Sequence, residues 1–234
     1  MTQTTTARAR SRLRPVGNPR EPGEGRGAAE TEPVDGRAAR SQRTRVAIVD
    51  ALRALNRDGH LAPTVAQVAE QAGISRRTVW QHFADLEALL AEAGRRDLEI
   101  AMSLSDPVDP DQPLAARIEQ LTAQRARIME AMAPSWRASR LQEPFSAQLR
   151  TNKQRMVAIA RAELERTFAP ELRTLRGRER ARLADAAHVA TLWATWESLR
   201  TEVGCTVREA RAVTAATLTS LFAAAASPGS GPDV

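Results

Sequence analysis

The fold of this chain is decided by residues 64–90, which read TVAQVAEQAGISRRTVWQHFADLEALL. They contain two short helical segments, at about 65–72 and 76–82, with Gly73 between them. The turn after the first segment needs a residue that tolerates a positive φ angle, and glycine does so without a steric penalty. Ser75 can then cap the second segment, because its hydroxyl accepts a hydrogen bond from a first-turn N–H group. The pattern therefore predicts a helix-turn-helix.

The second segment predicts a surface that can contact DNA. Val79 and Phe83 supply its apolar face. The other positions are almost all hydrogen-bond donors and include no acid: Arg76, Arg77, Thr78, Trp80, Gln81 and His82. A helix that lies in the major groove needs such a face. The full set of expected DNA contacts is Arg43, Arg45, Thr64, Ser75, Arg76, Arg77, Thr78, Trp80, Gln81 and His82.

These residues resemble the DNA-binding domain of TetR-type bacterial transcriptional regulators. The family pattern is Thr, then Ile/Val-Ala, Ala-Gly-Val-Ser, Thr-Leu-Tyr-x-His-Phe, a Lys-Glu pair and Leu-Leu. The chain matches it at Thr64, Val68, Ala69, Ala72, Gly73, Ser75, Thr78, His82, Phe83, Glu87, Leu89 and Leu90. The resemblance implies an N-terminal three-helix domain that binds a DNA operator, followed by a helical bundle that encloses a small ligand and forms a homodimer.

Two positions depart from the family pattern. Trp80 stands where the family has tyrosine, and its indole N–H can still reach a phosphate. Leu86 stands where the family has lysine, so one phosphate contact is lost. The N-terminal amides of the following helix can still face a phosphate, and Arg43, Arg45 or the Arg-rich N-terminal tail can add further contacts.

Composition narrows the class of protein without identifying the function. The 234 residues are 42% hydrophobic and only 3% aromatic, which argues against an all-β fold. The net charge is +6, but residues 41–105 are neutral overall, so the DNA-binding hypothesis depends on the motif. One cysteine and three histidines predict no metal site, and we expect no cofactor. No apolar run approaches ~18 residues and no signal peptide is apparent, so we expect a cytoplasmic protein without a membrane partner, associated with the bacterial nucleoid through DNA.

Glycine and proline divide the rest of the chain into an all-α arrangement of about nine helices. We expect them at about 43–58, 65–72, 76–82, 86–104, 114–132, 136–142, 146–168, 178–203 and 207–226, with Pro134 as a boundary. The expected domains are a disordered Arg-rich tail (1–40), the helix-turn-helix domain (41–90), a ligand-binding and dimerisation domain (91–226) and a disordered tail (227–234). Nine Gly or Pro among the first 40 residues support the N-terminal tail.

The C-terminal half carries the residues that the resemblance assigns to a ligand pocket. They are Arg125, Met129, Met132, Trp136, Phe145, Met156, His188, Trp193 and Trp196. Methionine and tryptophan suit an irregular apolar pocket, although each of these residues could equally belong to the core or to a dimer contact. Arg125 interrupts an apolar stripe and either pairs with an acid or meets an anionic ligand. Gly94 either softens the helix that links the two domains or is only a tolerated small residue.

The resemblance also places a four-helix dimer interface on the last two expected helices. Their small-residue faces are Leu183, Ala187, Ala190 and Ala194, and then Val207, Ala210, Thr214, Thr217, Leu218 and Leu221. A dimer also follows from the DNA side, because one short recognition helix reads only a few base pairs.

The sequence thus favours a sequence-specific DNA-binding regulator, a repressor that a small apolar or amphipathic ligand releases from a palindromic operator. The alternative is a ligand-independent regulator or an activator controlled by a protein partner. An enzyme is disfavoured, because the sequence contains no nucleophile–base pair at usable spacing and no phosphate-binding loop.

Overall fold

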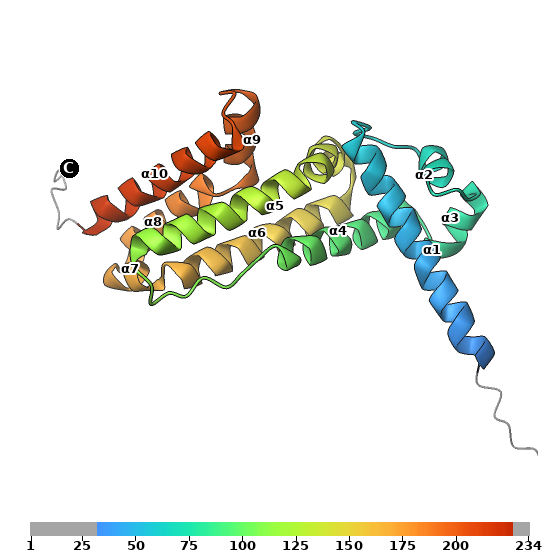
Figure 1. Cartoon of the computed structure of the whole chain (residues 1–234), viewed down its shortest axis with the longest axis horizontal. Helices are drawn as coiled ribbons and strands as arrows, with labels where there is room; N and C mark the ends of the chain where they lie inside the picture. The colour runs from blue at the N-terminus through green and yellow to red at the C-terminus, as the bar shows by residue number, and fades with distance from the viewer. Residues whose placement is uncertain (1–31, 227–234) are drawn as a thin grey trace, which may run out of the picture.

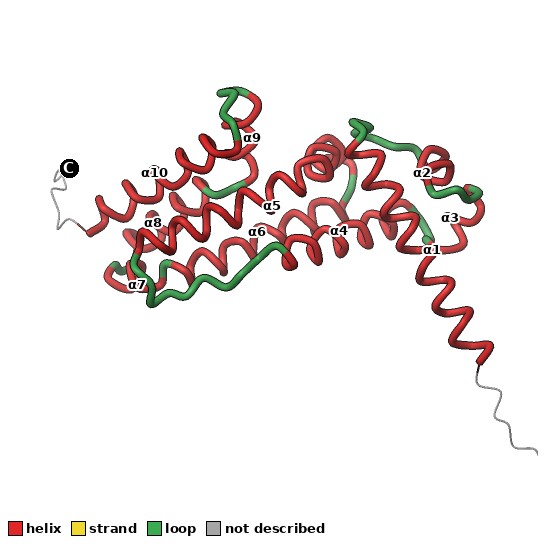
Figure 2. Tube along the Cα trace, viewed as in Figure 1, coloured by secondary structure: helices red, strands yellow, loops and turns green. Residues whose placement is uncertain are grey.

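The computed structural model describes residues 32–226, and these residues form helices and loops without a strand (Figures 1 and 2). The all-α fold class is therefore confirmed. The helices are α1 (Glu32–Arg57), α2 (Val65–Gln71), α3 (Arg76–His82), α4 (Leu86–Ser103), α5 (Leu114–Gln142), the 3₁₀ helix η1 (Glu143–Phe145), α6 (Ala147–Thr167), α7 (Ala169–Thr174), α8 (Gly177–Ala190), α9 (Trp193–Thr201) and α10 (Val207–Ala226).

Helices α1 to α3 form a unit at one end of the molecule, and α5 to α10 form a bundle at the other (Figure 1). The core of the N-terminal unit brings together Ile48, Val68, Val79 and Phe83 with Leu149 from α6. Because α6 contributes to this core, the two parts are packed against each other and do not meet through a bare linker. The bundle core lies between α5, α6, α8 and α10, where the Phe168 and Phe222 rings are 4.4 Å apart.

Helix α1 begins at Glu32, well before the expected start at residue 43. Part of the segment expected to be disordered is therefore helical. Pro33 lies in the first turn, where its missing N–H group is not needed, and Arg37-Ala-Ala-Arg40 favours a helix. The rest of the expected tail, residues 1–31, and the expected C-terminal tail, 227–234, lie outside the described residues.

The expected break at Pro134 is wrong, because α5 runs unbroken through it. A proline inside a helix costs about 3 kcal/mol. The residues around it are buried: Met132 is fully buried, and Ala133 and Ser135 are nearly so. Burying one methionine side chain contributes about 1.5–3 kcal/mol, so the packed flanks together offset the lost hydrogen bond.

The helix expected over 178–203 is also wrong, since it is two helices, α8 and α9, with a break at Thr191–Leu192. No glycine or proline marks this break. The Thr191 hydroxyl donates to the carbonyls of Ala187 (3.1 Å) and His188 (3.0 Å), and Thr195 donates to Val189 O at 2.6 Å. Threonine hydroxyls therefore satisfy the last carbonyls of α8 and allow the chain to turn. The short helix α7 is likewise absent from the expected set, and Pro170 lies in its first turn rather than in a loop.

Candidate nucleic-acid interface

The turn between α2 and α3 is built as the sequence predicts. Gly73 has a φ of 67°, in the left-handed region that favours glycine. Thr64 caps α2 reciprocally with Gln67: Gln67 N donates to Thr64 Oγ1 (3.3 Å), and Thr64 N donates to Gln67 Oε1 (2.9 Å). Ser75 Oγ accepts from Thr78 N at 3.0 Å. Thr64, Ser75 and Thr78 thus use their side chains to shape the motif, which leaves their hydroxyls less available to DNA.

The exposed face of α3 is formed by Arg76, Arg77, Trp80 and Gln81. Val79 and Phe83 on the opposite side are buried against the rest of the N-terminal unit. Trp80 is 44% exposed, so its side chain lies outside the core. Neither Arg76 nor Arg77 is paired with a carboxylate of residues 36–226. This face therefore presents two unpaired guanidinium groups, an amide and an indole N–H to the outside.

Arg45 and His82 take part in a contact that fixes the end of α3. The Arg45 guanidinium donates to the His82 carbonyl, lies 4.4 Å from the centroid of the Phe83 ring and is 4.0 Å from a Glu92 carboxylate oxygen. These three contacts favour a positioning role for Arg45 rather than a DNA contact. Arg43, two residues earlier and on a different face of α1, is exposed.

The N-terminus of α4, expected to face a phosphate, carries an acidic cap. Asp85 Oδ1 accepts from Ala88 N at 2.8 Å, and Leu86 is exposed beside it. A carboxylate at a helix N-terminus stabilises the helix, but it also occupies one amide and repels a phosphate. A phosphate at this helix end, as expected from the sequence, is therefore disfavoured. Asp85 is the residue in the sequence that indicates this.

A buried ion pair joins the N-terminal unit to the bundle. Arg53 Nε of α1 donates to Asp97 Oδ1 of α4 at 2.9 Å, and Ser135 Oγ of α5 lies 3.5 Å from the same oxygen. Burial raises the pKa of the Asp97 carboxyl above its ordinary value, and the attraction of Arg53 opposes this only in part. Three helices thus meet at one charged contact, which no motif in the sequence marks.

Helix α4 also approaches α6 closely at Gly94. Asn152 Nδ2 donates to Leu90 O at 3.0 Å, and a Cβ atom on Gly94 would lie 2.2 Å from that nitrogen. Glu87 Oε2 accepts from Gln148 N at 2.8 Å at the start of α6. Gly94 therefore permits a close helix approach, which neither of the two sequence readings of this residue anticipated.

We expect Gly94→Ala alone to change the free energy of unfolding by less than about 1 kcal/mol. Alanine favours the helix by about 0.8–1.0 kcal/mol, while displacing Asn152 loses a hydrogen bond worth about 0.5–1.5 kcal/mol. In an Asn152→Ala background the clash is absent, so the same change should stabilise the protein by up to about 1 kcal/mol. Urea titrations of the four proteins measure this coupling, and equal effects of Gly94→Ala in both backgrounds would contradict it.

The residues expected to line a ligand pocket are mostly packed into the bundle core. Met129, Met132 and Trp196 are buried, and Trp136 and Trp193 contact edge to face with ring centroids 5.1 Å apart. The half-buried Met156 packs against the Met132 cluster. The assignment of Phe145 to the pocket is wrong, because Phe145 lies in η1 with 89% of its surface exposed.

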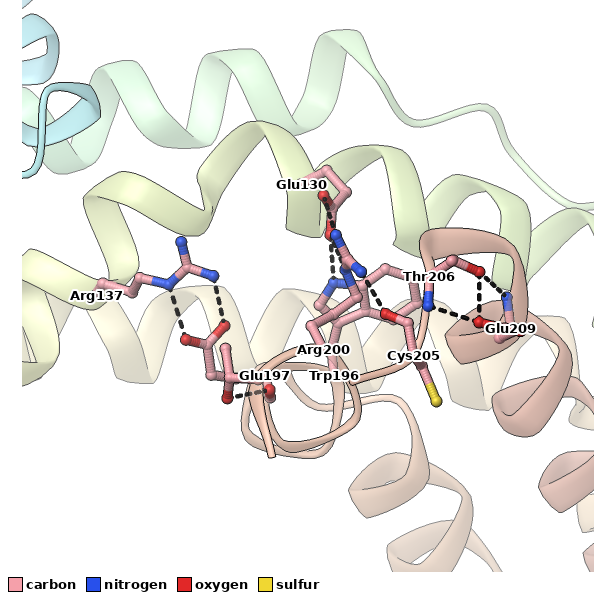
Figure 3. Close-up of polar contacts among 9 residues, drawn as sticks. Glu130, Arg137, Trp196, Glu197, Arg200, Cys205, Thr206 and Glu209 are labelled. Carbon is pink, nitrogen blue, oxygen red and sulfur yellow. Dashed lines mark hydrogen bonds and ion pairs between the residues drawn. The ribbon is translucent and has the colours of Figure 1, made fainter. Parts of the chain in front are cut away.

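Polar groups within the bundle are largely paired with one another. Arg125, 8% exposed, forms an ion pair with Glu163 at 2.7 Å, so it pairs with an acid, one of the two alternatives left open. The indole N–H of Trp196 donates to Glu130 Oε1 at 2.9 Å, and Arg200 donates to the same oxygen at 3.0 Å (Figure 3). His188 is buried, neither ring nitrogen has a hydrogen-bond partner, and burial followed by the nearby Arg161 and Arg125 lowers its pKa.

A small cavity lies between α5, the α8–α9 break and α10. It is lined by Thr122, Arg125, Met129, Ala190, Thr191, Leu192, Trp196 and Thr214, and its volume is about 10 Å³. That volume accommodates roughly one water molecule, whereas ligand pockets typically measure about 300–1,000 Å³. A ligand at this place would have to separate the surrounding helices.

The faces expected to form a dimer interface lie partly inside the chain. Leu183, Ala187, Ala210, Thr214 and Leu218 are buried within the bundle and are therefore not free for a partner. Within residues 36–226 there is no group of three metal-ligating side chains, and none of the described helices has the length and hydropathy to span a membrane.

Residues 48–93 match the family model described as bacterial regulatory proteins, tetR family, which confirms the resemblance seen in residues 64–90. A transcriptional regulator from Rhodococcus sp. Rha1 has a similar structure, with 17% identity, a TM-score of 0.59 and coverage of 79% of this chain and 96% of that one. A protein of Mesorhizobium loti MAFF303099 assigned to the TetR family of regulators is similar at 19% identity and a TM-score of 0.57, covering 79% and 98%. The search of curated proteins yields no match.

Proposed function

We propose, from the match of residues 48–93 to the tetR family and from the exposed face of α3, that the protein is a sequence-specific DNA-binding transcriptional regulator. The observation that carries this proposal is the set of unpaired donors on α3, Arg76, Arg77 and Gln81, held by a capped helix-turn-helix. Arginine can bind guanine and glutamine can bind adenine through paired hydrogen bonds in the major groove. Trp80 and His82 are proposed to contact phosphates.

The regulator is proposed to act as a homodimer through α8 and α10. After Arg211, α10 carries no charged residue up to its end at Ala226. Its exposed positions, among them Val213, Ala216 and Thr217, are small and uncharged, and Val189 of α8 is 56% exposed. Small side chains let two helices approach closely, and pairing two reading helices would give a palindromic operator.

Selection of bound duplexes from a random DNA library tests this function directly. The full-length protein should enrich two inverted half-sites, one for each α3, and light scattering should give twice the chain mass. Enrichment of no sequence over the starting library would contradict the proposal.

We further propose that the protein is a repressor. A small apolar or amphipathic ligand would open the cavity beside Arg125 and release the protein from DNA. The roughly water-sized volume of that cavity favours a second candidate, a regulator that needs no small ligand and is controlled by a protein partner. The two candidates differ in whether any small molecule binds the bundle.

We expect a ligand found by thermal-shift screening to lower operator affinity by about 5- to 150-fold, the usual range for coupled sites. Ala190→Leu fills the cavity and should abolish this response. Ala158→Leu, at an exposed position of α6, is the matched control and should respond like the unmodified protein. Operator affinity is measured with and without ligand for all three proteins.

Overpacking typically costs about 1–3 kcal/mol, so a melting curve must first show that Ala190→Leu remains folded. A library without a stabilising compound would favour control by a partner. An Ala190→Leu variant that responds normally would instead mean that the ligand binds away from this cavity.

A further inference from the structure

The first part of α1 extends beyond the N-terminal unit without a packed neighbour (Figure 1). Every side chain from Gly36 to Arg43 is exposed, and full burial begins only at Ile48. We call residues 36–43 the α1 extension. A short helix that is polar on all sides is only marginally stable in water without a partner. The extension is therefore a surface that lacks a stabilising contact within the described chain.

The α1 extension is strongly basic. Residues 36–43 contain three arginines and no acid, and Glu32 and Asp35 precede them in α1. Arg37, Arg40 and Arg43 are exposed, and no described carboxylate pairs with them. Their spacing of three residues spreads them over about 120° of the helix surface. Such a surface fits a polyanion better than it fits an apolar or a basic partner.

The contact of Arg45 with His82 holds the basic α1 extension near the C-terminal end of α3. Arg45 joins the base of the extension to the C-terminal end of α3, the helix proposed to enter the major groove. Arg37 precedes Arg45 by eight positions, which corresponds to roughly 12 Å along the helix axis. One base pair rises about 3.4 Å, so Arg37 lies roughly three to four base-pair rises from the contact at Arg45.

We propose that the α1 extension binds the sugar-phosphate backbone of the duplex beside the bases that α3 reads, through Arg37, Arg40 and Arg43. The inference rests on the proposed DNA-binding function and enlarges the footprint by roughly three to four base pairs per protomer. Phosphate contacts carry no base information, so the extension raises affinity for every flanking sequence equally.

The test compares two duplexes that carry a half-site pair selected by the full-length protein. One duplex ends at the edges of the half-sites, and the other continues for roughly eight further base pairs on each side, well beyond the reach of the extension. The variant combines Arg37→Gln, Arg40→Gln and Arg43→Gln. The control combines Arg155→Gln, Arg166→Gln and Arg173→Gln, which removes the same charge from exposed, unpaired positions of α6 and α7.

The unmodified protein and the control should bind the long duplex more tightly than the short one, whereas the extension variant should bind both equally. Three lost phosphate contacts should reduce the slope of log affinity against log salt by about 2.7 per protomer. The affinity advantage of the unmodified protein over the variant should then shrink roughly 40-fold per protomer between 50 and 200 mM salt.

The same gain from flanking DNA and the same salt slope in all three proteins would overturn this inference while leaving the proposed function intact. The extension would then belong to another acidic partner. If no protein prefers the selected half-sites over unrelated DNA, the proposed function itself fails.

Discussion

Asp97→Ala is expected to lower the free energy of unfolding by about 3–5 kcal/mol, because it leaves Arg53 without its partner in a largely buried site. Arg53→Met should cost a similar amount, since it leaves the buried Asp97 carboxylate unpaired. The double variant Arg53→Met/Asp97→Leu removes both charges and should regain most of the loss. Chemical denaturation of the three variants measures these differences, and additive losses in the double variant would contradict the prediction.

The raised pKa of Asp97 adds a pH dependence to this test. The native state holds the Asp97 proton more tightly than the unfolded chain, whose value is close to 3.8. The stability that protonation confers is therefore fully present below pH 3.8 and is lost as the pH rises through the raised pKa. The difference in unfolding free energy between the unmodified protein and Asp97→Asn should fall over that interval, while a flat difference would mean that the carboxyl titrates normally.

The double variant also tests whether the ion pair orients the N-terminal unit in addition to stabilising the fold. Arg53, Asp97 and Ser135 lie on three different helices. Their contact therefore fixes the orientation of the N-terminal unit, α1 to α3, relative to the bundle. Apolar replacements can restore burial but not the directional hydrogen bonds. Operator affinity below that of the unmodified protein, in a double variant of normal stability, would identify the pair as a positioning contact.

Arg77→Ala should relax base preference at one or two positions of each half-site. A bidentate arginine–guanine contact contributes about 1–3 kcal/mol of discrimination, so the preferred operator should lose about 1–3 kcal/mol relative to single-base variants, and about twice that relative to operators changed in both half-sites. Arg77 is exposed and unpaired, so the fold should be unaffected. Binding to a panel of single-base operator variants gives the measurement.

Arg57→Ala, an exposed arginine of α1 outside the reading face, is the matched control and should keep the preference of the unmodified protein. If Arg76→Ala, Arg77→Ala and Gln81→Ala all retain that preference, the assignment of α3 as the reading helix is wrong.

The sequence predicted most reliably those elements that depend on local chemistry. The bounds of α3, the positive φ of Gly73 and the caps of Thr64 and Ser75 follow from residues within a few positions of one another. The break between α8 and α9 instead depends on threonine hydroxyls, and α5 passes through Pro134 because its flanks are buried. At Pro134 tertiary burial outweighs the local proline signal, and the sequence contains no direct measure of that burial.

In the candidate site, too, the features that follow from local sequence could be predicted, and those that depend on tertiary packing could not. The exposed donors of α3 follow from helical periodicity, so they could be assigned in advance. Arg45 was assigned to DNA from its charge, but its contacts with His82 and Phe83 depend on the packing of α1 against α3. The resemblance assigns Phe145 to a pocket, and only the path of η1 shows that it is exposed.

The exposure of Trp80 gives the protein an intrinsic optical reporter. The chain contains four tryptophans and no tyrosine, so its near-ultraviolet emission comes from indole groups. Trp136, Trp193 and Trp196 lie within the bundle, whereas Trp80 alone is on the reading face. A collisional quencher such as acrylamide should therefore reach mainly Trp80, and a duplex seated on α3 would shield it. Occupancy of the reading helix can thus be followed in the unlabelled protein.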